Sequence, residues 1–428
     1  MAKRTMICRE NSPIPSPISE MPVETPEWLN VCFVQKALRK SEEDNSINVI
    51  DIFTKPATNK GDNYGSDMIR ALVEYTQDQA GRKITKKKSI IVKIAPINDG
   101  IRKDLILNSS FFDTEMSMMS NTLIKMNQLL KFKHLLSAKC LYTQKRDIPL
   151  LMLQDLAPLG FRMADREVGL DLAHCILALQ GLAKFHAASV AVYEKEPSQK
   201  QLYVSGTFNP EHPKNFRDYF KNTVQSLGKE IETWPEMDQK YTKKIVNIAS
   251  RTYEIGTKVS KPREGDFCVI NHGDFWVNNM LFKYNEAGKP IDHIFVDFQL
   301  AVYTSPAIDL LYFLSTSPSV ETIEDNKDVL LDEYLKTLSC TMKEIGCKTQ
   351  PPTIEKLKDS LKERAAYGMI ASFTVLPIVL CEKENIRDID EIIGDDGRYE
   401  NLSIKGALFR KIISKRIPMY DEMGLLDL

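Results

Sequence analysis

The sequence has few features of a secreted, zinc-binding or membrane protein. Its eight cysteines and six histidines are scattered over 428 residues without a CxxC or HExxH spacing, which excludes the usual structural zinc sites. The first residues, MAKRTMICRENSPIPSPISEMP, are polar and proline-rich and contain no apolar core of a signal peptide. No run approaches the roughly 18 apolar residues that a membrane span needs. We therefore expect reduced thiols, a cytoplasmic location and no membrane partner.

The sequence also lacks an excess of charge of either sign. Lys and Arg total 57 and Asp and Glu total 58, so the formal net charge is -1. A nearly neutral chain gives no reason to expect a nucleic acid partner, and the three tryptophans do not cluster as a base-stacking platform. The composition is that of an ordinary globular protein and leaves the oligomeric state open.

Short strand patterns dominate the first 150 residues. Residues 1–24 are rich in proline, serine and glutamate and predict a flexible tail. The stretch EWLNVCFVQKALRK has helical spacing and predicts a helix over 27–40. Alternating and β-branched runs predict five strands, at 47–55, 67–77, 89–96, 139–144 and 149–156. The lysines at 86–88 are assigned to a solvated hairpin turn between the second and third strands.

Helical patterns dominate the rest of the chain. They cover 169–195, 213–230, 236–260, 326–346, 354–382 and 403–416. One hairpin interrupts them, formed by MLFKY and IDHIFVDF around the turn NEAGK. This order is the layout of a protein-kinase-like fold, so we predict an α+β bilobal protein. Its expected parts are an N-terminal lobe over 25–150, a hinge over 151–160 and a helical C-terminal lobe over 161–428.

Lys93 stands inside the apolar run SIIVKIAP. Burying an unpaired ammonium there would cost several kcal/mol, so the lysine either reaches solvent at an edge or meets a carboxylate. Glu115 is available on the following helix, predicted over 111–132, on the face of Phe112 and Met119, and Asp113 is a weaker rival partner. A lysine held by a helical glutamate can present its charge to nucleotide phosphates.

The segment KGDNYGSD lies between the first two strands. Its backbone N–H groups could cradle phosphates, with Gly61, Asn63, Gly65 and Ser66 as the candidate contacts. The simpler alternative is an ordinary hairpin turn, because glycine with aspartate or asparagine fills many turns. No GK[ST] follows, so the segment is not a Walker A loop.

The most specific pattern is NHGDFWVNNMLF followed by HIFVDF. Asp274 lies in a loop beside His272 and Gly273, where a carboxylate can accept the proton of a substrate hydroxyl. Asn279 offers a side-chain oxygen to Mg²⁺, and Asp297 ends an otherwise apolar strand, where it can bridge the metal to nucleotide phosphates. The two hairpin strands are expected to bring Asn279 and Asp297 to the same open end.

Several motifs carry a family resemblance. HGDFWVNN resembles the H-G-D-x-x-x-x-N catalytic loop of the aminoglycoside phosphotransferase and choline kinase group, and VDFQ is similar to the metal-binding segment of that group. Together with LAKFHAAS, LMLQDL, GDNYGS and SPAIDLLYFL, they resemble the insect ecdysteroid kinase-like family, also called CHK kinase-like proteins, over residues 30 to 415. The chain has Asp297-Phe298-Gln299 where protein kinases carry D-F-G, and it has no A-P-E segment, which disfavours a protein substrate.

The resemblance implies a role for each matching residue. Asp274 would be the catalytic base, and Asn279 and Asp297 the Mg²⁺ ligands. Lys93, with Glu115, would position the phosphates of ATP.

Other implied roles concern the hinge and the support of the catalytic loop. The backbone around Gln154 to Leu156 would meet the adenine, and His272 and Asp309 would hold the loop. For Asp309 an alternative is a helix N-cap after Ser305 and Pro306. His186, in LAKFHAAS, is expected to be a packing histidine.

The sequence thus predicts an ATP- and Mg²⁺-dependent kinase of a small-molecule alcohol, and the resemblance suggests an ecdysteroid or another steroid-like or xenobiotic alcohol. The apolar stretch 365–380 is interpreted as core, with a wall of the acceptor pocket as the alternative. Two other functions stay open at this point. One is a choline- or ethanolamine-type kinase, and the other is a catalytically silent protein that binds a small molecule.

Overall fold

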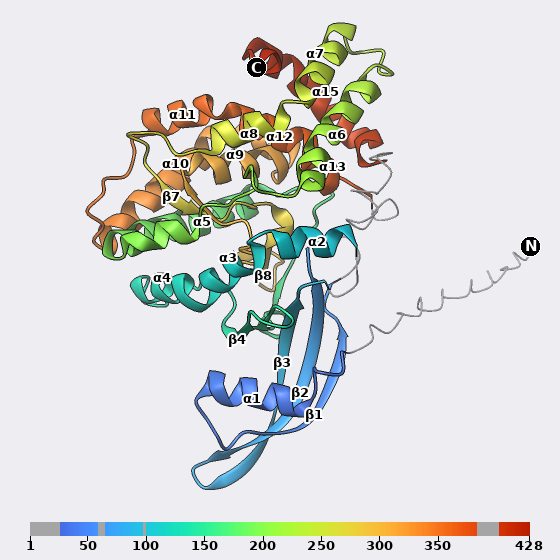
Figure 1. The fold of residues 1–428 in the computed structure, drawn as a ribbon. Helices are drawn as coiled ribbons and strands as arrows, with labels where there is room; N and C mark the ends of the chain where they lie inside the picture. Colours follow the sequence, from blue (N-terminus) through green and yellow to red (C-terminus); the bar gives the residue numbers. More distant parts are fainter. Residues whose placement is uncertain (1–25, 59–64, 97–99, 383–401) are drawn as a thin grey trace, which may run out of the picture.

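The N-terminal part of the protein is a five-stranded antiparallel sheet (Figure 1). The computed structural model describes residues 26–58, 65–96, 100–382 and 402–428, so the predicted tail over 1–24 lies outside the described residues. The strands are β1 (Asn48–Pro56), β2 (Asp67–Gln79), β3 (Arg82–Ile94), β4 (Cys140–Gln144) and β5 (Leu150–Gln154). Their order in the sheet is β1-β2-β3-β5-β4. All five predicted strands are present.

The lysine run lies within a strand, so its prediction as a turn was wrong. β2 and β3 continue to Gln79 and Arg82, and the turn consists of Ala80 and Gly81, both with positive φ. Lysines are tolerated in the strand because opposite charges face them: Lys87 pairs with Glu74 on β2, and the Lys88 ammonium lies 2.7 Å from Glu42.

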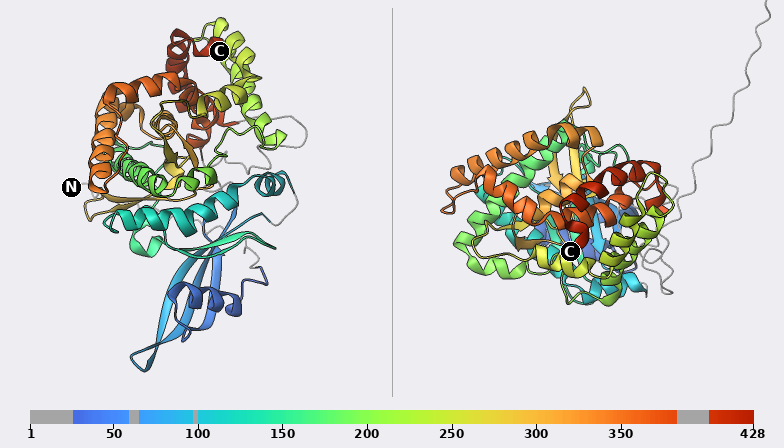
Figure 2. Two further views of the ribbon diagram at one scale, coloured as in Figure 1. Left: turned by 60° about the vertical axis from the view of Figure 1, so that its left-hand side comes forward. Right: turned by 90° about the horizontal axis from the view of Figure 1, so that it is seen from above.

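One helix, α1 (Val31–Glu42), covers a face of this sheet (Figures 1 and 2). The side chain of Asn30 caps its first turn by accepting from the Phe33 N–H. Val34, Ala37 and Leu38 recur at helical spacing and are buried in a small core beneath the sheet. The predicted helix over 27–40 is therefore present, shifted by a few residues.

The helical segment after the sheet's third strand is interrupted. It comprises α2 (Ile101–Asn108), α3 (Phe111–Ser117), a π-helical turn (Met118–Thr122) and α4 (Leu123–Leu129). The predicted single helix over 111–132 thus contains one wider turn, a feature often found at functional sites.

Helices form most of the C-terminal part. In chain order these are α5 (Leu172–Lys195), α6 (Lys214–Ile231), α7 (Gln239–Ala249), α8 (Thr252–Ser260), α9 (Ala307–Thr316), α10 (Val320–Glu344), α11 (Ile354–Glu363), α12 (Ala365–Thr374), α13 (Leu376–Val379) and α15 (Ala407–Glu422). Short breaks divide the predicted helix over 236–260 around Ser250 and the predicted helix over 354–382 at Arg364 and Val375. The mixed class, with an antiparallel sheet followed by a helical part, is confirmed.

Helix α5 lies in the main hydrophobic core. By length and composition it is the one described helix that could cross a membrane, but 78% of its most apolar window is buried inside the protein. It packs along α10 and against β9 (Pro290–Phe295), a strand of the predicted hairpin. Its apolar character is accounted for by these contacts.

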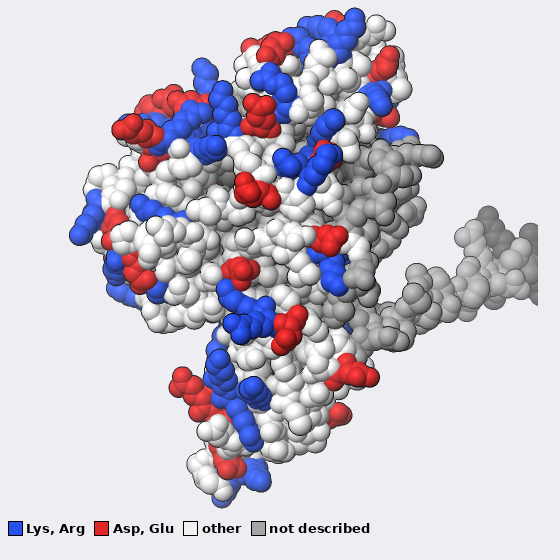
Figure 3. All heavy atoms as spheres, viewed as in Figure 1, with Lys and Arg blue, Asp and Glu red and all other residues white. Residues whose placement is uncertain are grey.

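The predicted hairpin is present and packs against helix α5. It consists of β8 (Met280–Tyr284) and β9 (Pro290–Phe295), with Met280 paired to Phe295, and the two-residue strand β6 (Phe161–Arg162) joins it. A second small sheet pairs β7 (Val269–Asn271) with β10 (Val302–Thr304). Acidic and basic side chains are interspersed on the face shown in Figure 3, in line with the nearly neutral net charge.

Candidate active site

A cleft of about 310 Å³ lies between the N-terminal sheet and the hairpin β8–β9. Six of the residues that the sequence singles out line it, from five different parts of the chain: Lys93, Glu115, Gln154, Leu156, Asn279 and Asp297. Gly65 and Ser66 are described but do not line this cleft, whereas Ala57 and Thr58, on the other side of the loop, do. Gly61 and Asn63 lie outside the described residues.

Lys93 joins two carboxylates at the back of the cleft. Its ammonium lies 2.6 Å from a Glu115 oxygen and 2.8 Å from Asp297 Oδ1, and the lysine is only 3% exposed. Burial alone lowers the pKa of Lys93, but the two carboxylates outweigh it and raise that pKa above its ordinary value. Lys93 is therefore charged and held in place, as the buried-pair interpretation predicts.

Helix α3 aims Glu115 at the lysine. Phe111, Phe112 and Met116 of this helix are buried in the main core, which fixes the face that Glu115 shares with them. Burial raises the pKa of Glu115, and Lys93 opposes that rise. The rival Asp113 points to the surface, where its carboxylate lies 2.7 Å from Lys145.

Asp297 follows β9 in a strained conformation. Its φ of 65° lies in the left-handed region, which is uncommon for a residue with a side chain. The preceding Val296 N–H donates to the Asn279 carbonyl oxygen at 3.1 Å, so the ends of the two hairpin segments are adjacent. The hairpin thus brings Asn279 and Asp297 together in the way the sequence predicts.

Asn279 connects the cleft to Asp274. Its side-chain amide donates to the Asp274 carbonyl oxygen at 2.9 Å and to Asp274 Oδ2 at 2.8 Å. The other carboxylate oxygen, Oδ1, accepts from the Tyr312 hydroxyl at 2.7 Å. Burial and the nearby charge of Asp297 raise the pKa of Asp274 to about 6, against the two hydrogen bonds, which lower it.

Asp309 holds the backbone of the loop that contains Asp274. Its two oxygens accept from the N–H groups of His272 at 2.7 Å and Gly273 at 2.8 Å, and His186 lies 3.0 Å from Oδ2. Asp309 is completely buried and lies within the first turn of α9, so it does not cap that helix. His186 also bonds to Tyr334, which gives this buried histidine a polar role that the packing interpretation missed.

Gly273 is required by its surroundings. Its φ is +82°, and a Cβ added there would lie 1.9 Å from the Leu300 carbonyl oxygen. The loop can therefore pass under Leu300 only with glycine before Asp274. Next to it, the His272 ring lies 3.0 Å from the Val296 carbonyl oxygen, and burial lowers the pKa of this histidine.

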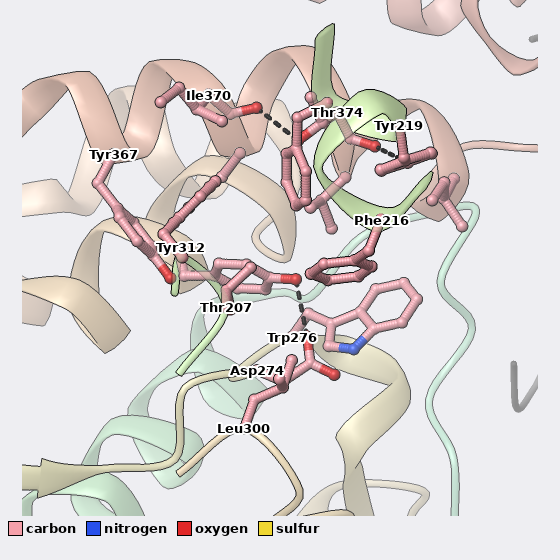
Figure 4. A pocket seen from close by; sticks show the side chains of 15 residues that line it. Thr207, Phe216, Tyr219, Asp274, Trp276, Leu300, Tyr312, Tyr367, Ile370 and Thr374 are labelled. Atoms are coloured by element: carbon pink, nitrogen blue, oxygen red, sulfur yellow. Dashed lines mark hydrogen bonds between the residues drawn. The ribbon is translucent and has the colours of Figure 1, made fainter. Parts of the chain in front are cut away.

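A second cavity, of about 170 Å³, opens on the other side of Asp274 (Figure 4). Its walls are almost entirely apolar or aromatic, and Asp274 is the one charged residue among the described lining residues. The lining comprises Thr207, Phe208, Phe216, Tyr219, Phe220, Asp274, Trp276, Leu300, Tyr312, Tyr367, Ile370, Ala371, Thr374, Val375 and Ile378. We call this cavity the acceptor pocket.

The stretch 365–380 forms one wall of the acceptor pocket, so its interpretation as plain core was incomplete. Tyr367, Ile370 and Ala371 face the cavity from α12, although all three are nearly inaccessible to solvent. Trp276 lies at the opposite side in Figure 4. Sequence reasoning left both alternatives open for these residues, because only packing decides which side of a buried helix meets a cavity.

Tyr312 and Asp155 are site residues that sequence reasoning missed. Tyr312 was visible only as part of SPAIDLLYFL, three residues after Asp309, and this spacing places both on α9 near the loop. Asp155, between Gln154 and Leu156, accepts from Arg70 at 2.8 Å and from Ser89 at 2.6 Å. These bonds tie the end of β5 to β2 and β3.

Comparison with known proteins identifies the group to which this site belongs. The model of the ecdysteroid kinase-like family matches residues 60–347, which include Lys93, Glu115 and the segment from Asp274 to Asp297. The chain belongs to the ecdysteroid kinase-like family. Family membership supports the coarse assignment of the protein as a kinase of small molecules.

Other comparisons add less. No curated protein matches the chain. Among solved structures, amicoumacin kinase hAmiN, in complex with AMP-PNP, Ca²⁺ and Ami, has 15% sequence identity and a TM-score of 0.39, with 81% of this chain and 86% of that chain covered.

Proposed function

We propose that this ecdysteroid kinase-like protein transfers the γ-phosphate of ATP to a hydroxyl group of an ecdysteroid or a similar steroid-like or xenobiotic alcohol. The observation that carries the proposal is the position of Asp274 between two cavities. Its carboxylate lines the acceptor pocket, while its hydrogen-bond partner Asn279 lines the cleft that contains Lys93. Phosphoryl transfer needs this juxtaposition of a nucleotide site, a base and an acceptor site.

The cleft residues fit a divalent cation bound together with nucleotide phosphates. No group of three or more histidine, cysteine, aspartate or glutamate side chains gathers as a metal site among the described residues. Mg²⁺ bound to ATP needs only one or two protein ligands, because phosphate oxygens and water supply the rest. Asn279 donates through its amide nitrogen, which leaves its side-chain oxygen for the cation, and Asp297 has a second carboxylate oxygen besides the one on Lys93. Bound Mg²⁺ would neutralise phosphate charge there.

The chain's own groups carry the remaining chemistry. Lys93 would contact the phosphates, and the backbone from Gln154 to Leu156 would meet the adenine. Asp274 would accept the proton of the acceptor hydroxyl as that oxygen forms its bond to the γ-phosphorus. The bond between this phosphorus and the bridging oxygen then breaks, and ADP leaves. His272 and Asp309 would keep the loop of Asp274 in place.

The acceptor pocket favours an apolar alcohol. Its volume of about 170 Å³ is close to that of a cavity that binds benzene, about 150 Å³. We therefore propose that one hydroxyl-bearing ring enters beside Asp274 and that the remainder of a steroid-sized acceptor extends out of the pocket. Choline is the second candidate, because aromatic rings next to a carboxylate also suit a quaternary ammonium. A silent binding protein would not need the complete set of Lys93, Glu115, Asp274, Asn279 and Asp297.

The first test measures nucleotide binding by thermal shift, and a turnover screen follows it. We expect Mg-ATP to raise the melting temperature of the protein, because a ligand that binds only the native state stabilises it. ATP with a chelator should raise it much less, since Asn279 and Asp297 act through the cation. Equal shifts with and without Mg²⁺ would contradict the proposed metal site. An ATP-consumption screen over ecdysteroids, choline and plant phenols would then identify the acceptor.

The pH dependence of kcat/KM should report the ionisation of the Asp274 carboxylate. The carboxylate accepts a proton only when it is ionised, so kcat/KM is expected to fall as the pH drops below about 6. Tyr312→Phe removes a hydrogen bond that lowers this pKa, so the acidic limb should move to higher pH. Tyr367→Phe is the matched control, because Tyr367 lines the same pocket without bonding to Asp274. An unshifted limb in Tyr312→Phe would argue against Asp274 as the titrating base.

Substitutions in the wall of the acceptor pocket should change KM for the acceptor alcohol and leave KM for ATP unchanged. Phe216→Ala removes an aromatic wall and is expected to raise KM for an apolar alcohol about tenfold, with KM for ATP unchanged. Phe53→Ala, at an exposed position on β1, serves as control. Steady-state kinetics with one steroid, one phenol and choline would check this. Choline turnover above that of every steroid and phenol would favour the second candidate.

A further inference from the structure

A third and larger cavity lies within the helical part of the protein. It has a volume of about 680 Å³ and is enclosed by α9, α10, α11, α12 and α15, labelled in Figure 1. We call it the α15 groove. None of its lining residues lines the cleft or the acceptor pocket, so the proposed kinase reaction makes no use of it. Its volume falls within the range of small-molecule sites, about 300–1,000 Å³.

The floor of the α15 groove is apolar and its rim is cationic. Leu314, Leu331, Leu361 and Ile412 are buried along the floor. Of the residues that the structure describes, six cationic side chains line the groove: Lys327, Lys358, Lys362, Lys411, Lys415 and Arg416. Two carboxylates of the same described set line it, Glu324 and Asp328.

Both lining carboxylates already have cationic partners. Lys415 lies 2.9 Å from Glu324, and Lys358 lies 2.7 Å from Asp328. Outside the lining, hydrogen bonds from its own backbone N–H and from Ser319 lower the pKa of Glu321, and the charges of Lys411 and Lys415 lower it further. Among the described residues that line the groove, cations therefore outnumber carboxylates by six to two.

Arg416 is the decisive residue. Its Nη1 donates to the Ser315 carbonyl oxygen at 2.6 Å and to Ser372 Oγ at 2.9 Å, so neutral groups hold the guanidinium in position. No carboxylate of the described residues forms an ion pair with it, although Arg416 is half-buried against the groove. A guanidinium beside apolar walls is stabilised by a charge-assisted hydrogen bond to an anion, and its planar fork suits a carboxylate.

We propose that the α15 groove binds an amphiphilic anion, a long-chain carboxylate whose head group meets Arg416. Its hydrocarbon chain would lie along Leu314, Leu331 and Ile412, where burial of apolar surface supplies the affinity. The rim lysines would add long-range attraction for the negative charge.

The groove and the acceptor pocket share two helices. Tyr312 of α9 and Tyr367 of α12 face the pocket, whereas Leu311 and Gly368 of the same helices face the groove. A Cβ at Gly368 would lie 2.9 Å from Ser315 Oγ, so the two helices approach closely. A ligand in the groove therefore contacts the same pair of helices as the phosphate acceptor, on a different face of each helix.

Calorimetric titration of the full chain with dodecanoate tests the proposal. We expect saturable one-to-one binding, with dodecanol and dodecyltrimethylammonium binding at least tenfold more weakly. Arg416→Gln should weaken dodecanoate binding about tenfold, the usual effect of losing a charge-assisted hydrogen bond. Arg410→Gln is the matched control, because Arg410 lies on the same helix and pairs with Glu236 outside the groove. Equal affinity for the acid and the alcohol would overturn the proposal.

Two further variants guard against misfolding and against binding elsewhere. If Arg416→Gln strongly lowers the melting temperature, the double variant Lys362→Gln with Lys327→Gln is used in its place. Both lysines are exposed on the rim of the groove, and their loss should weaken dodecanoate binding several-fold. Phe216→Ala, in the acceptor pocket, should leave dodecanoate binding unchanged. Loss of binding in Phe216→Ala, or full binding in the rim variant, would overturn the assignment to this groove.

Discussion

Asp274→Asn is expected to lower the rate of phosphoryl transfer by about 10²–10⁴, the usual effect of losing a positioned base. The carboxylate is the group that can take the hydroxyl proton at the boundary between the acceptor pocket and the cleft. Asparagine has nearly the same shape: its one oxygen can accept from the Asn279 amide, and its amide nitrogen can donate to the Tyr312 hydroxyl oxygen, which can accept as well as donate. The fold and the affinity for Mg-ATP should therefore stay close to those of the unchanged protein.

Single-turnover kinetics and ATP titrations would measure both effects. Asp292→Asn is a suitable control, because this carboxylate is half-exposed on β9 outside both cavities and should leave the rate unchanged. Asp297→Asn should instead weaken metal-dependent nucleotide binding as well as turnover. If Asp274→Asn lost nucleotide binding as severely as Asp297→Asn, the proposed division of roles within the loop would be wrong.

Lys93→Met is expected to reduce kcat/KM for ATP by about 10²–10³, comparable to removing one preorganised donor from a transition-state site. Lys93 is the buried cation of the cleft, and the structure fixes its ammonium between Glu115 and Asp297. Without Lys93, the phosphates lose a positive charge that is already held in position before the reaction begins. Lys87→Met, on the same strand but exposed and paired with Glu74, should retain nearly full activity.

The lysine substitution also leaves two carboxylates unpaired, and this effect must be separated from catalysis. Removing one partner of a buried pair costs roughly 3–5 kcal/mol of stability, so Lys93→Met alone should lower the melting temperature. The double variant Lys93→Met with Glu115→Gln removes a charge of each sign and should recover part of that loss. Its activity should remain low. Recovery of activity together with stability would show that Lys93 acts only in folding.

Local patterns in the sequence determined the elements that carry the site. The apolar run around Lys93 required either a surface position or a partner, because an unpaired buried ammonium is too costly. The hairpin motif placed Asn279 and Asp297 at one open end, since the two strands that precede and follow the turn have nearly equal length. These inferences depend only on neighbours along the chain or on short pairing, and the structure shows both arrangements.

Errors arose where long-range pairing outweighs local composition. Three successive lysines are typical of a solvated turn, yet cross-strand partners on β2 and the carboxylate of Glu42 on α1 keep them in β3. The π turn after α3 and the break at Arg364 also make contacts with distant segments: Thr122 of the π turn bonds to Gln199 and Tyr203, and Arg364 pairs with Asp266. The helical pattern of the sequence continues through both positions.

The sequence by itself determined the order of sheet and helices and the chemical types that meet in the cleft, because these follow from periodicity and from the cost of burying charge. Only the tertiary structure decided what surrounds Asp274. Tyr312 reaches it from α9, and Tyr367 reaches the same pocket from α12, at separations of 38 residues or more. The shape of the acceptor pocket and the position of Arg416 depend on how whole helices pack against one another. No local sequence pattern specifies such contacts, because each is set by the combined burial of many side chains.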